Sequence, residues 1–315
     1  MMLNLLLLAT SLVLLYAGAA ALVRGGASVA QRLKVSALVI GLTVVAYGTS
    51  MPELLVSAKA ALAGRGDLAV GNVVGSNIFN IAVILGLAAA ICPMKVQFQL
   101  IRQDAPFLLL ATGLFWWFVR EGLISRAEAA WLCGGLVIYT VGSLYLVRRE
   151  VAATVDAEFQ AALPPLSRHW LVDLVFIGAG LGLLAVGSRM LVDNAAALAR
   201  AWGVSEAVIG LTIVAAGTSV PELATTVVAA LKKQPDIAVG NVVGSNIYNL
   251  LGVAGISGVL APLSAPGLQA FDLYWMAGLT VILFPMLWTG LMIKRWEGVV
   301  LLGAYGIYLA VLWPK

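Results

Sequence analysis

Long apolar runs dominate this chain and restrict what it can fold into. They fall near residues 3–23, 36–63, 69–91, 105–119, 127–147, 171–192, 205–231, 237–260, 271–292 and 297–313. A bilayer core of about 30 Å needs roughly 20 apolar residues per helix. The runs are continuous and do not alternate with a period of two, so a β-barrel is not expected. We therefore predict an all-α integral membrane protein with ten transmembrane helices.

Composition excludes other classes of protein. Apolar residues make up 62% of the chain and charged residues 11%, against roughly 45–50% and about 25% in soluble domains. The net charge of +4 is spread over short connections, so nucleic acid is not an expected partner. No protein partner is evident, and the lipid bilayer is the expected surrounding. The first run lacks a preceding basic region, so we interpret it as a membrane helix in preference to a cleaved signal.

Basic residues predict an orientation. When the connections are assigned alternately to the two sides, one side receives more of them, including Arg148, Arg149, Lys232 and Lys233. The positive-inside rule makes that side cytoplasmic and places both termini outside, in the inner or plasma membrane of a prokaryote. The segment 151–170, which contains Pro164 and Pro165, then forms a cytoplasmic connecting loop between halves 1–150 and 171–315.

The two halves contain the same pair of motifs. GLTVVAYGTSMPEL at 41–54 recurs as GLTIVAAGTSVPEL at 210–223, and GNVVGSNIFN at 71–80 recurs as GNVVGSNIYN at 240–249. Both pairs are separated by 169 positions. Five predicted helices separate each motif from its copy, and this odd number inverts the second copy. Inverted repeats with interrupted helices indicate a secondary transporter with its site at the repeat interface.

The first motif predicts a broken helix with an intramembrane acid. Pro52 and Pro221 cannot donate a backbone hydrogen bond, so helices 2 and 7 should be discontinuous, with freed carbonyls around Ala46 to Gly48 and around Ala215 to Gly217. An acidic residue within a span costs roughly 2.5–3.5 kcal/mol, so Glu53 and Glu222 are expected to be functional. The alternatives are a protonated glutamate hydrogen-bonded between helices, or a glutamate that caps the half-helix.

The motifs supply further oxygen donors at matching positions. They are the hydroxyls of Thr49, Ser50, Ser76, Thr218, Ser219 and Ser245 and the amides of Asn80 and Asn249. A set of oxygens without His or Cys favours a hard cation, and Ca²⁺ takes six to eight of them. Na⁺ could use the same ligands, so the predicted substrates are Ca²⁺ and Na⁺, with no cofactor.

Other motif residues are interpreted as structural support. Four further asparagines are expected to bond freed backbone groups in preference to binding the ion directly: Asn72, Asn77, Asn241 and Asn246. The glycine pairs Gly71 and Gly75, and Gly240 and Gly244, have a spacing that allows close helix contact. Asp67 and Asp236, matched before a helix, are predicted to be N-caps.

The paired motifs GTSxPE and GNxxGSNIxN, present twice, resemble the α-repeats of the cation/Ca²⁺ exchanger superfamily, in its Na⁺/Ca²⁺ exchanger branch. The resemblance implies a ten-helix, five-plus-five inverted fold in which Glu53 and Glu222 hold Ca²⁺. It also implies that the six motif hydroxyls and the carbonyls of Ala46 and Ala215 share in coordinating Na⁺ and Ca²⁺. Some family members, including potassium-dependent ones, have Asp at the last position of the second repeat's GSNIxN element. This chain has Asn in both copies, Asn80 and Asn249, so a K⁺ requirement is less expected here.

The sequence leaves other functions to be weighed. The main hypothesis is an antiporter that exchanges Ca²⁺ for Na⁺ by alternating access, and the alternative is a proton-coupled Ca²⁺ exchanger. A channel is disfavoured because paired broken helices are typical of transporters. An enzyme is not expected, since the single histidine, His169, lies in the predicted cytoplasmic connection, away from any nucleophile.

Overall fold

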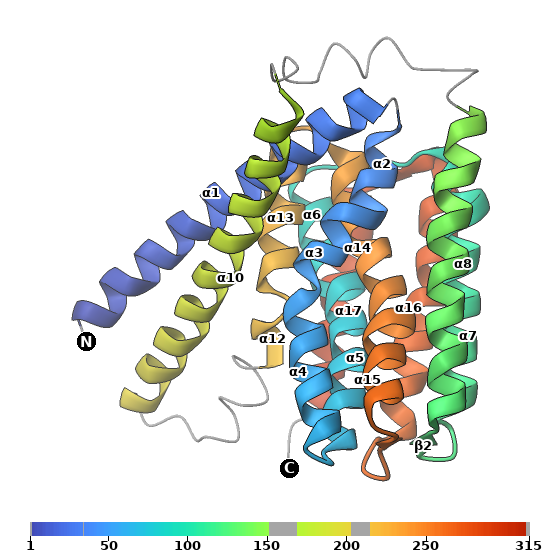
Figure 1. Ribbon diagram of the computed structural model, residues 1–315. Helices are drawn as coiled ribbons and strands as arrows, with labels where there is room; N and C mark the ends of the chain where they lie inside the picture. The colour runs from blue at the N-terminus through green and yellow to red at the C-terminus, as the bar shows by residue number, and fades with distance from the viewer. Residues whose placement is uncertain (1, 34, 151–168, 203–214, 313–315) are drawn as a thin grey trace.

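The computed structural model describes residues 2–33, 35–150, 169–202 and 215–312 (Figure 1). The predicted helical segment at 205–214 and most of the predicted connecting loop lie outside these residues. In chain order the elements are α1 (Met2–Leu33), α2 (Ala37–Ile40), η1 (Gly41–Val45), α3 (Ala46–Thr49), α4 (Met51–Leu62), α5 (Gly66–Phe79), η2 (Asn80–Leu85), α6 (Gly86–Ile91), β1 (Met94–Lys95), η3 (Leu100–Asp104), α7 (Ala105–Val119), β2 (Leu123–Ile124), α8 (Arg126–Glu150), α10 (Trp170–Ala201), α12 (Ala215–Gly217), α13 (Val220–Leu231), α14 (Pro235–Tyr248), η5 (Asn249–Val253), α15 (Ala254–Leu260), β3 (Leu263–Ser264), α16 (Ala270–Trp288), η6 (Thr289–Leu291), β4 (Met292–Ile293) and α17 (Arg295–Leu312).

Helices long and apolar enough to cross a membrane make up most of the described chain. Six qualify by length and composition: Asn4–Leu33, Gly66–Ile91, Trp170–Ala201, Pro235–Leu260, Ala270–Leu291 and Arg295–Leu312. The bent pair Ala37–Thr49 and Met51–Leu62 adds a seventh. The other predicted spans overlap α7, α8 and α13, of which α7 has 15 residues and α13 has 12. The count of ten therefore stays a prediction.

Helices α1 and α10 form a long pair that lies obliquely against the rest of the bundle (Figure 1). Each has 32 residues, or about 48 Å at 1.5 Å per residue. The predicted ends near residues 23 and 192 were wrong, because charged side chains continue both helices. Arg24 lies over the ring of Phe176 at 4.8 Å, and the Arg32 Nε atom pairs with the Asp173 Oδ2 atom at 2.6 Å.

The broken helices of the first motif are present in both halves. In the first half α3 ends at Thr49, α4 begins at Met51, and the two are bent by 46°. In the second half α12 ends at Gly217 and α13 begins at Val220. Proline occupies the first turn of α4 and of α13, where its missing N–H would be unpaired in any case. The break predicted from the prolines is confirmed in both copies.

The second motif lies on the most buried spans of the bundle. Within Pro235–Leu260, 89% of an 18-residue apolar stretch is buried inside the bundle. The corresponding share within Gly66–Ile91 is 67%. Gly240 and Gly244 lie against the backbone of Leu38 and Leu42, where an added Cβ would overlap, so the predicted close contact is confirmed in this half. Nothing described lies within 4 Å of a Cβ added at Gly71 or Gly75. Each motif ends in a π-helical stretch, η2 or η5.

Short strands and loops connect the two halves at both ends of the bundle. Strand β1 pairs antiparallel with β4, with Met94 opposite Ile293, and β2 pairs with β3, with Leu123 opposite Ser264. The predicted N-caps Asp67 and Asp236 were wrong, since Arg65 and Gln234 occupy the cap positions. Instead Asp67 accepts a hydrogen bond from the Gly267 amide, and Asp236 from the Gln97 side chain, both at 2.8 Å.

Candidate cation site

Two glutamates from opposite halves lie in the core of the bundle. Glu53 and Glu222 are fully buried in the first turns of α4 and α13. Each accepts a hydrogen bond from a serine of the other half. Ser219 donates to the Glu53 Oε1 atom at 2.8 Å, and Ser50 donates to the Glu222 Oε1 atom at 2.7 Å. The two helix breaks therefore meet, and each acid is held by the opposite break.

The threonines of the first motif link each break to an asparagine of the other half. Thr49 donates to the Asn241 Oδ1 atom at 3.2 Å, and Thr218 donates to the Asn72 Oδ1 atom at 3.4 Å. In turn Asn72 donates to the carbonyl of Glu53, and Asn241 to that of Glu222, at 3.2 and 3.3 Å. Asn72 and Asn241 thus bond the backbone that positions the glutamates.

The second motif brings its serines and asparagines into the same buried region. Ser76, Ser245, Asn80 and Asn249 are all buried. Ser76 lies 3.3 Å from the Ser219 hydroxyl, which also bonds Glu53. The Asn80 Nδ2 atom donates to the Asn246 Oδ1 atom at 3.0 Å. Asn246 thus contacts another motif residue, whereas Asn77 donates to the Val73 carbonyl of its own helix.

Several buried oxygens of the two motifs have no hydrogen-bond partner among the residues that the structure describes. They include the Glu53 Oε2, Glu222 Oε2, Ser245 Oγ, Asn80 Oδ1 and Asn249 Oδ1 atoms. Buried polar atoms are rarely left unpaired, and such an atom costs roughly 1–3 kcal/mol. Within the described residues no group of three or more His, Cys, Asp or Glu side chains is arranged to hold a metal ion. The donors gathered here are two carboxylates and neutral oxygens, a set that suits a hard cation.

The carbonyls at the helix breaks differ from the simplest expectation. The Ala46 carbonyl is not freed, since it accepts from the Ser50 amide at 3.0 Å and from the Thr49 hydroxyl at 3.3 Å. The Thr49 hydroxyl has a single proton and lies as close to the Val45 carbonyl and to the Asn241 Oδ1 atom, at 3.1 and 3.2 Å. When it bonds either of these, the Ala46 carbonyl keeps a lone pair that an ion can use. Ala215 is the first residue of α12. Proline removes the ordinary partner of the carbonyl four residues earlier, and at Gly217 this carbonyl accepts from Ser188 of α10 at 2.8 Å.

Three supporting hydroxyls were not identified from the sequence. Ser57 and Thr226 accept from the Asn72 and Asn241 side chains, each at 2.9 Å. A signal for them was present, because both follow a motif glutamate by one helical turn and they match across the repeat. Ser188 had no such signal, since the matching residue in the first half is Ala19.

Comparison with known proteins points to one family. The model of a family described as "Sodium/calcium exchanger protein" matches residues 3–145 and 172–313. The inner membrane protein YrbG of Escherichia coli is 36% identical to this chain, and the alignment covers 99% of this chain and 98% of YrbG. The sodium/calcium exchanger MaX1 of Methanosarcina acetivorans is 33% identical, with 98% of each chain covered.

A solved structure resembles the whole fold. The sodium-calcium exchanger NCX_Mj, soaked with Na⁺ and Ca²⁺, superimposes with a TM-score of 0.83 at 30% identity, over 98% of each chain. NCX_Mj has been described in terms of extracellular ion exchange and induced occlusion of its binding site. The similarity extends over both halves of the chain and includes both copies of each motif.

Proposed function

The chain belongs to the sodium/calcium exchanger family, a family of membrane cation/Ca²⁺ antiporters, and we propose that it exchanges Ca²⁺ for Na⁺. Both ions would be substrates that bind in turn at the site between Glu53 and Glu222. The proposal rests on one observation above all. Each of these buried glutamates has one carboxylate oxygen bonded to a serine of the other half and one oxygen with no hydrogen-bond partner among the described residues.

The chemistry of the donors supports Ca²⁺ as one substrate. Two carboxylates balance the charge of one Ca²⁺, and the neutral oxygens around them allow the coordination number of six to eight that it prefers. The proposed ligands are the side chains of Glu53, Glu222, Thr49, Ser50, Thr218, Ser219, Ser76, Ser245, Asn80 and Asn249 and the carbonyls of Ala46 and Ala215. Na⁺ would compete for the same oxygens.

We further propose that the halves are inverted five-helix repeats, ten transmembrane helices in all, with both termini outside and residues 151–170 cytoplasmic. The contacts between the halves support symmetry, because they occur in matched pairs. The bond from Ser50 to Glu222 corresponds to that from Ser219 to Glu53, and the bond from Thr49 to Asn241 corresponds to that from Thr218 to Asn72.

Alternating access would involve movement of α1 and α10 together past the rest of the bundle. Their mutual packing supports movement as a pair, since Gly18 and Gly180 bring the two backbones into contact. The ion pair between Arg32 and Asp173 joins them near one end. Because α1 and α10 pack more closely on each other than on the other helices, the two can slide together while the helices of the site stay in place.

The experiment is Ca²⁺ uptake by purified protein in proteoliposomes, with outward gradients of Na⁺, K⁺ and H⁺ imposed separately. The Na⁺ gradient should drive saturable uptake, and Glu53→Gln or Glu222→Gln should each reduce it to the level of empty vesicles. Glu121→Gln is the matched control, because Glu121 is exposed and lies outside the site. Normal uptake in both glutamine variants would overturn the proposal.

Proton coupling is the second candidate, and one observation favours it. Neither glutamate forms an ion pair with a basic side chain within the described residues. Two buried carboxylates without a basic partner can each bind a proton when no cation is present. If this reading is correct, a proton gradient drives Ca²⁺ uptake in vesicles that contain no Na⁺, and the Na⁺ gradient alone does not.

A further inference from the structure

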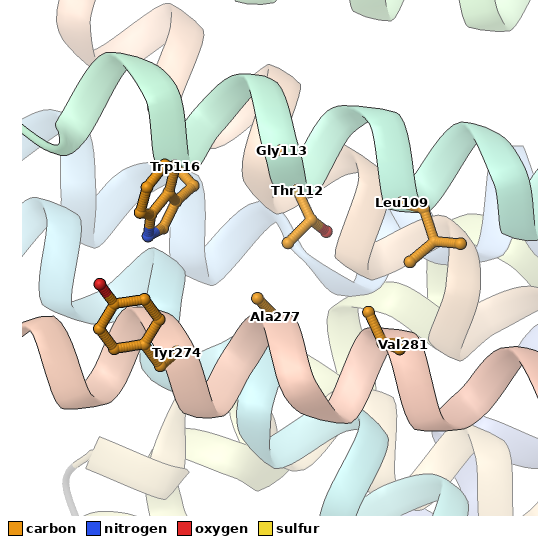
Figure 2. Close-up of a pocket in the computed structure, with 7 residues that line it drawn as sticks. All are labelled: Leu109, Thr112, Gly113, Trp116, Tyr274, Ala277 and Val281. Carbon is orange, nitrogen blue, oxygen red and sulfur yellow. The ribbon is translucent and has the colours of Figure 1, made fainter.

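A groove between α7 and α16 lies apart from the cation site. It has a volume of about 270 Å³. Figure 2 shows side chains of both helices along it, with residue numbers that rise in opposite directions. The residues that define its length are Leu109, Gly113 and Trp116 of α7 and Val281, Ala277 and Tyr274 of α16.

Small residues open the middle of the groove. Gly113 faces Ala277 between the two larger pairs at the ends (Figure 2), and no atom of the described residues lies within 4 Å of a Cβ added at Gly113. Thr112 also lines the groove, but its hydroxyl donates to the Leu108 carbonyl at 2.8 Å. The groove therefore presents mainly hydrocarbon along its length.

The residues beside the groove are exposed and apolar, as expected of a surface that faces lipid. Leu110 on α7 is 71% exposed, and Val281 and Ile282 on α16 are exposed as well. Helix α16 belongs to one of the apolar segments long enough to cross a membrane. In a family of integral membrane proteins, a groove on such a face opens into the acyl chains of the bilayer.

One end of the groove has the features of a membrane surface. Trp116 and Tyr274 lie there with ring centroids 6.3 Å apart, and such aromatic side chains are typical of the level of the lipid headgroups. Arg120 follows Trp116 by one turn and ends α7, with its guanidinium 3.4 Å from the centroid of the Trp117 ring. Its ion pair with Glu121 is long, 3.4 Å, and solvent-exposed, so it contributes little.

We propose that this groove binds one acyl chain of a phospholipid whose phosphate is held by Arg120. The positive charge lies at the aromatic end, where a phosphate would be, and the apolar part extends from there toward the middle of the membrane. A lipid fits better than a second copy of the chain. A helix is about 10–12 Å across with its side chains, which is too wide for a cavity of this size.

The test uses the full-length exchanger in phosphatidylcholine vesicles that contain a small fraction of phosphatidylglycerol with a photoactivatable acyl chain. After illumination, mass spectrometry of peptides locates the adducts. We expect them to concentrate on residues 109–117 and 274–281. Gly113→Leu, which fills the groove, should remove this concentration, whereas Gly303→Leu should not, because Gly303 is an equally open, exposed glycine on α17.

Arg120→Gln tests the phosphate contact separately. One basic residue near a membrane surface favours an anionic lipid by about fivefold, so adducts in the groove should fall by about this factor. Even labelling of all lipid-facing helices, unchanged by Gly113→Leu, would overturn the proposal. Cross-links that join α7 of two protein copies would also overturn it, since a second copy would then be the occupant. Folding of each variant is checked by its thermal unfolding temperature.

Discussion

Asn80 and Asn249 hold matching positions in the two halves but have different surroundings. The Asn80 side chain donates to Asn246, whereas neither amide atom of Asn249 has a hydrogen-bond partner in the described part of the chain. Both residues are buried and both begin a π-helical stretch. Such stretches often occur at functional sites. The two residues are therefore expected to differ in what they contribute to stability, although both are proposed to bind the ion.

We predict that Asn80→Ala destabilises the protein more than Asn249→Ala. Removal of Asn80 leaves the Asn246 Oδ1 atom without its partner, at a cost of about 1–3 kcal/mol, whereas removal of Asn249 breaks no side-chain hydrogen bond to any described residue. The measurement is the unfolding temperature in detergent without Ca²⁺ or Na⁺. Both variants should also show a smaller increase in that temperature on addition of Ca²⁺.

Asn194→Ala serves as the control, because the Asn194 amide donates to the Met190 carbonyl of its own helix, away from the site. It should leave the increase caused by Ca²⁺ unchanged. Equal unfolding temperatures for Asn80→Ala and Asn249→Ala would contradict the predicted asymmetry. A full Ca²⁺ response in both variants would remove these residues from the proposed ligands.

At the residue scale, the sequence predicts which residues come together at the site, but it does not predict which of them form hydrogen bonds with each other. The duplicated motifs identified both glutamates and the serines that hold them, because symmetry and the cost of a buried acid indicate function. Sequence could not predict that each serine would bond the glutamate of the other half. That pairing depends on how the two breaks face each other, and this follows from the packing of helices far apart in the chain.

Among the elements, α1 and α10 depend most on glycine for their contact. A Cβ added at Gly180 would lie 2.7 Å from the Leu22 amide nitrogen and 2.8 Å from the Gly18 carbonyl oxygen. Small residues at such positions let helix backbones approach closely in membranes. The close approach also brings Arg32 to Asp173. The proposed movement of the pair therefore depends on these glycines.

We predict that Gly180→Leu abolishes Ca²⁺ exchange, because it forces α1 away from α10. Overpacking of this kind commonly costs about 1–3 kcal/mol or more. Gly178→Leu is the matched control on the same helix, since Gly178 is exposed and a Cβ there meets nothing within 4 Å. Transport is measured per amount of folded protein. Exchange at the parent rate in Gly180→Leu would contradict a role for the close contact.

At the element scale, apolar runs predicted the position of the helices but not their ends. Charge was the misleading signal, since the predicted runs stop just before Arg24 and Asp193, whereas the helices continue to Leu33 and Ala201. Arg24 remains in its helix because it lies over an aromatic ring of α10. Proline was a reliable signal for the breaks, since its effect on the backbone is local.

Contacts join the two halves of the molecule at the cation site, at the paired strands and at two loops. Polar pairs connect them at the site, the paired strands β1–β4 and β2–β3 connect them elsewhere, and Asp67 and Asp236 each bond a loop of the other half. Each half alone would leave its glutamate buried without the serine that bonds it, which is costly in a membrane. The assembled form is thus the stable one for both halves.

We predict that the chain still works when residues 151–168 are removed and its two halves are supplied as separate pieces. The pieces 1–150 and 169–315, expressed together with different affinity tags, should copurify and restore Ca²⁺ exchange in proteoliposomes, because each of the contacts described above between the halves joins a residue of one piece to a residue of the other. Neither piece alone should transport. Glu222→Gln in the second piece should abolish transport without preventing copurification, which separates assembly from ion binding. Pieces that accumulate in the membrane but do not copurify would contradict this prediction.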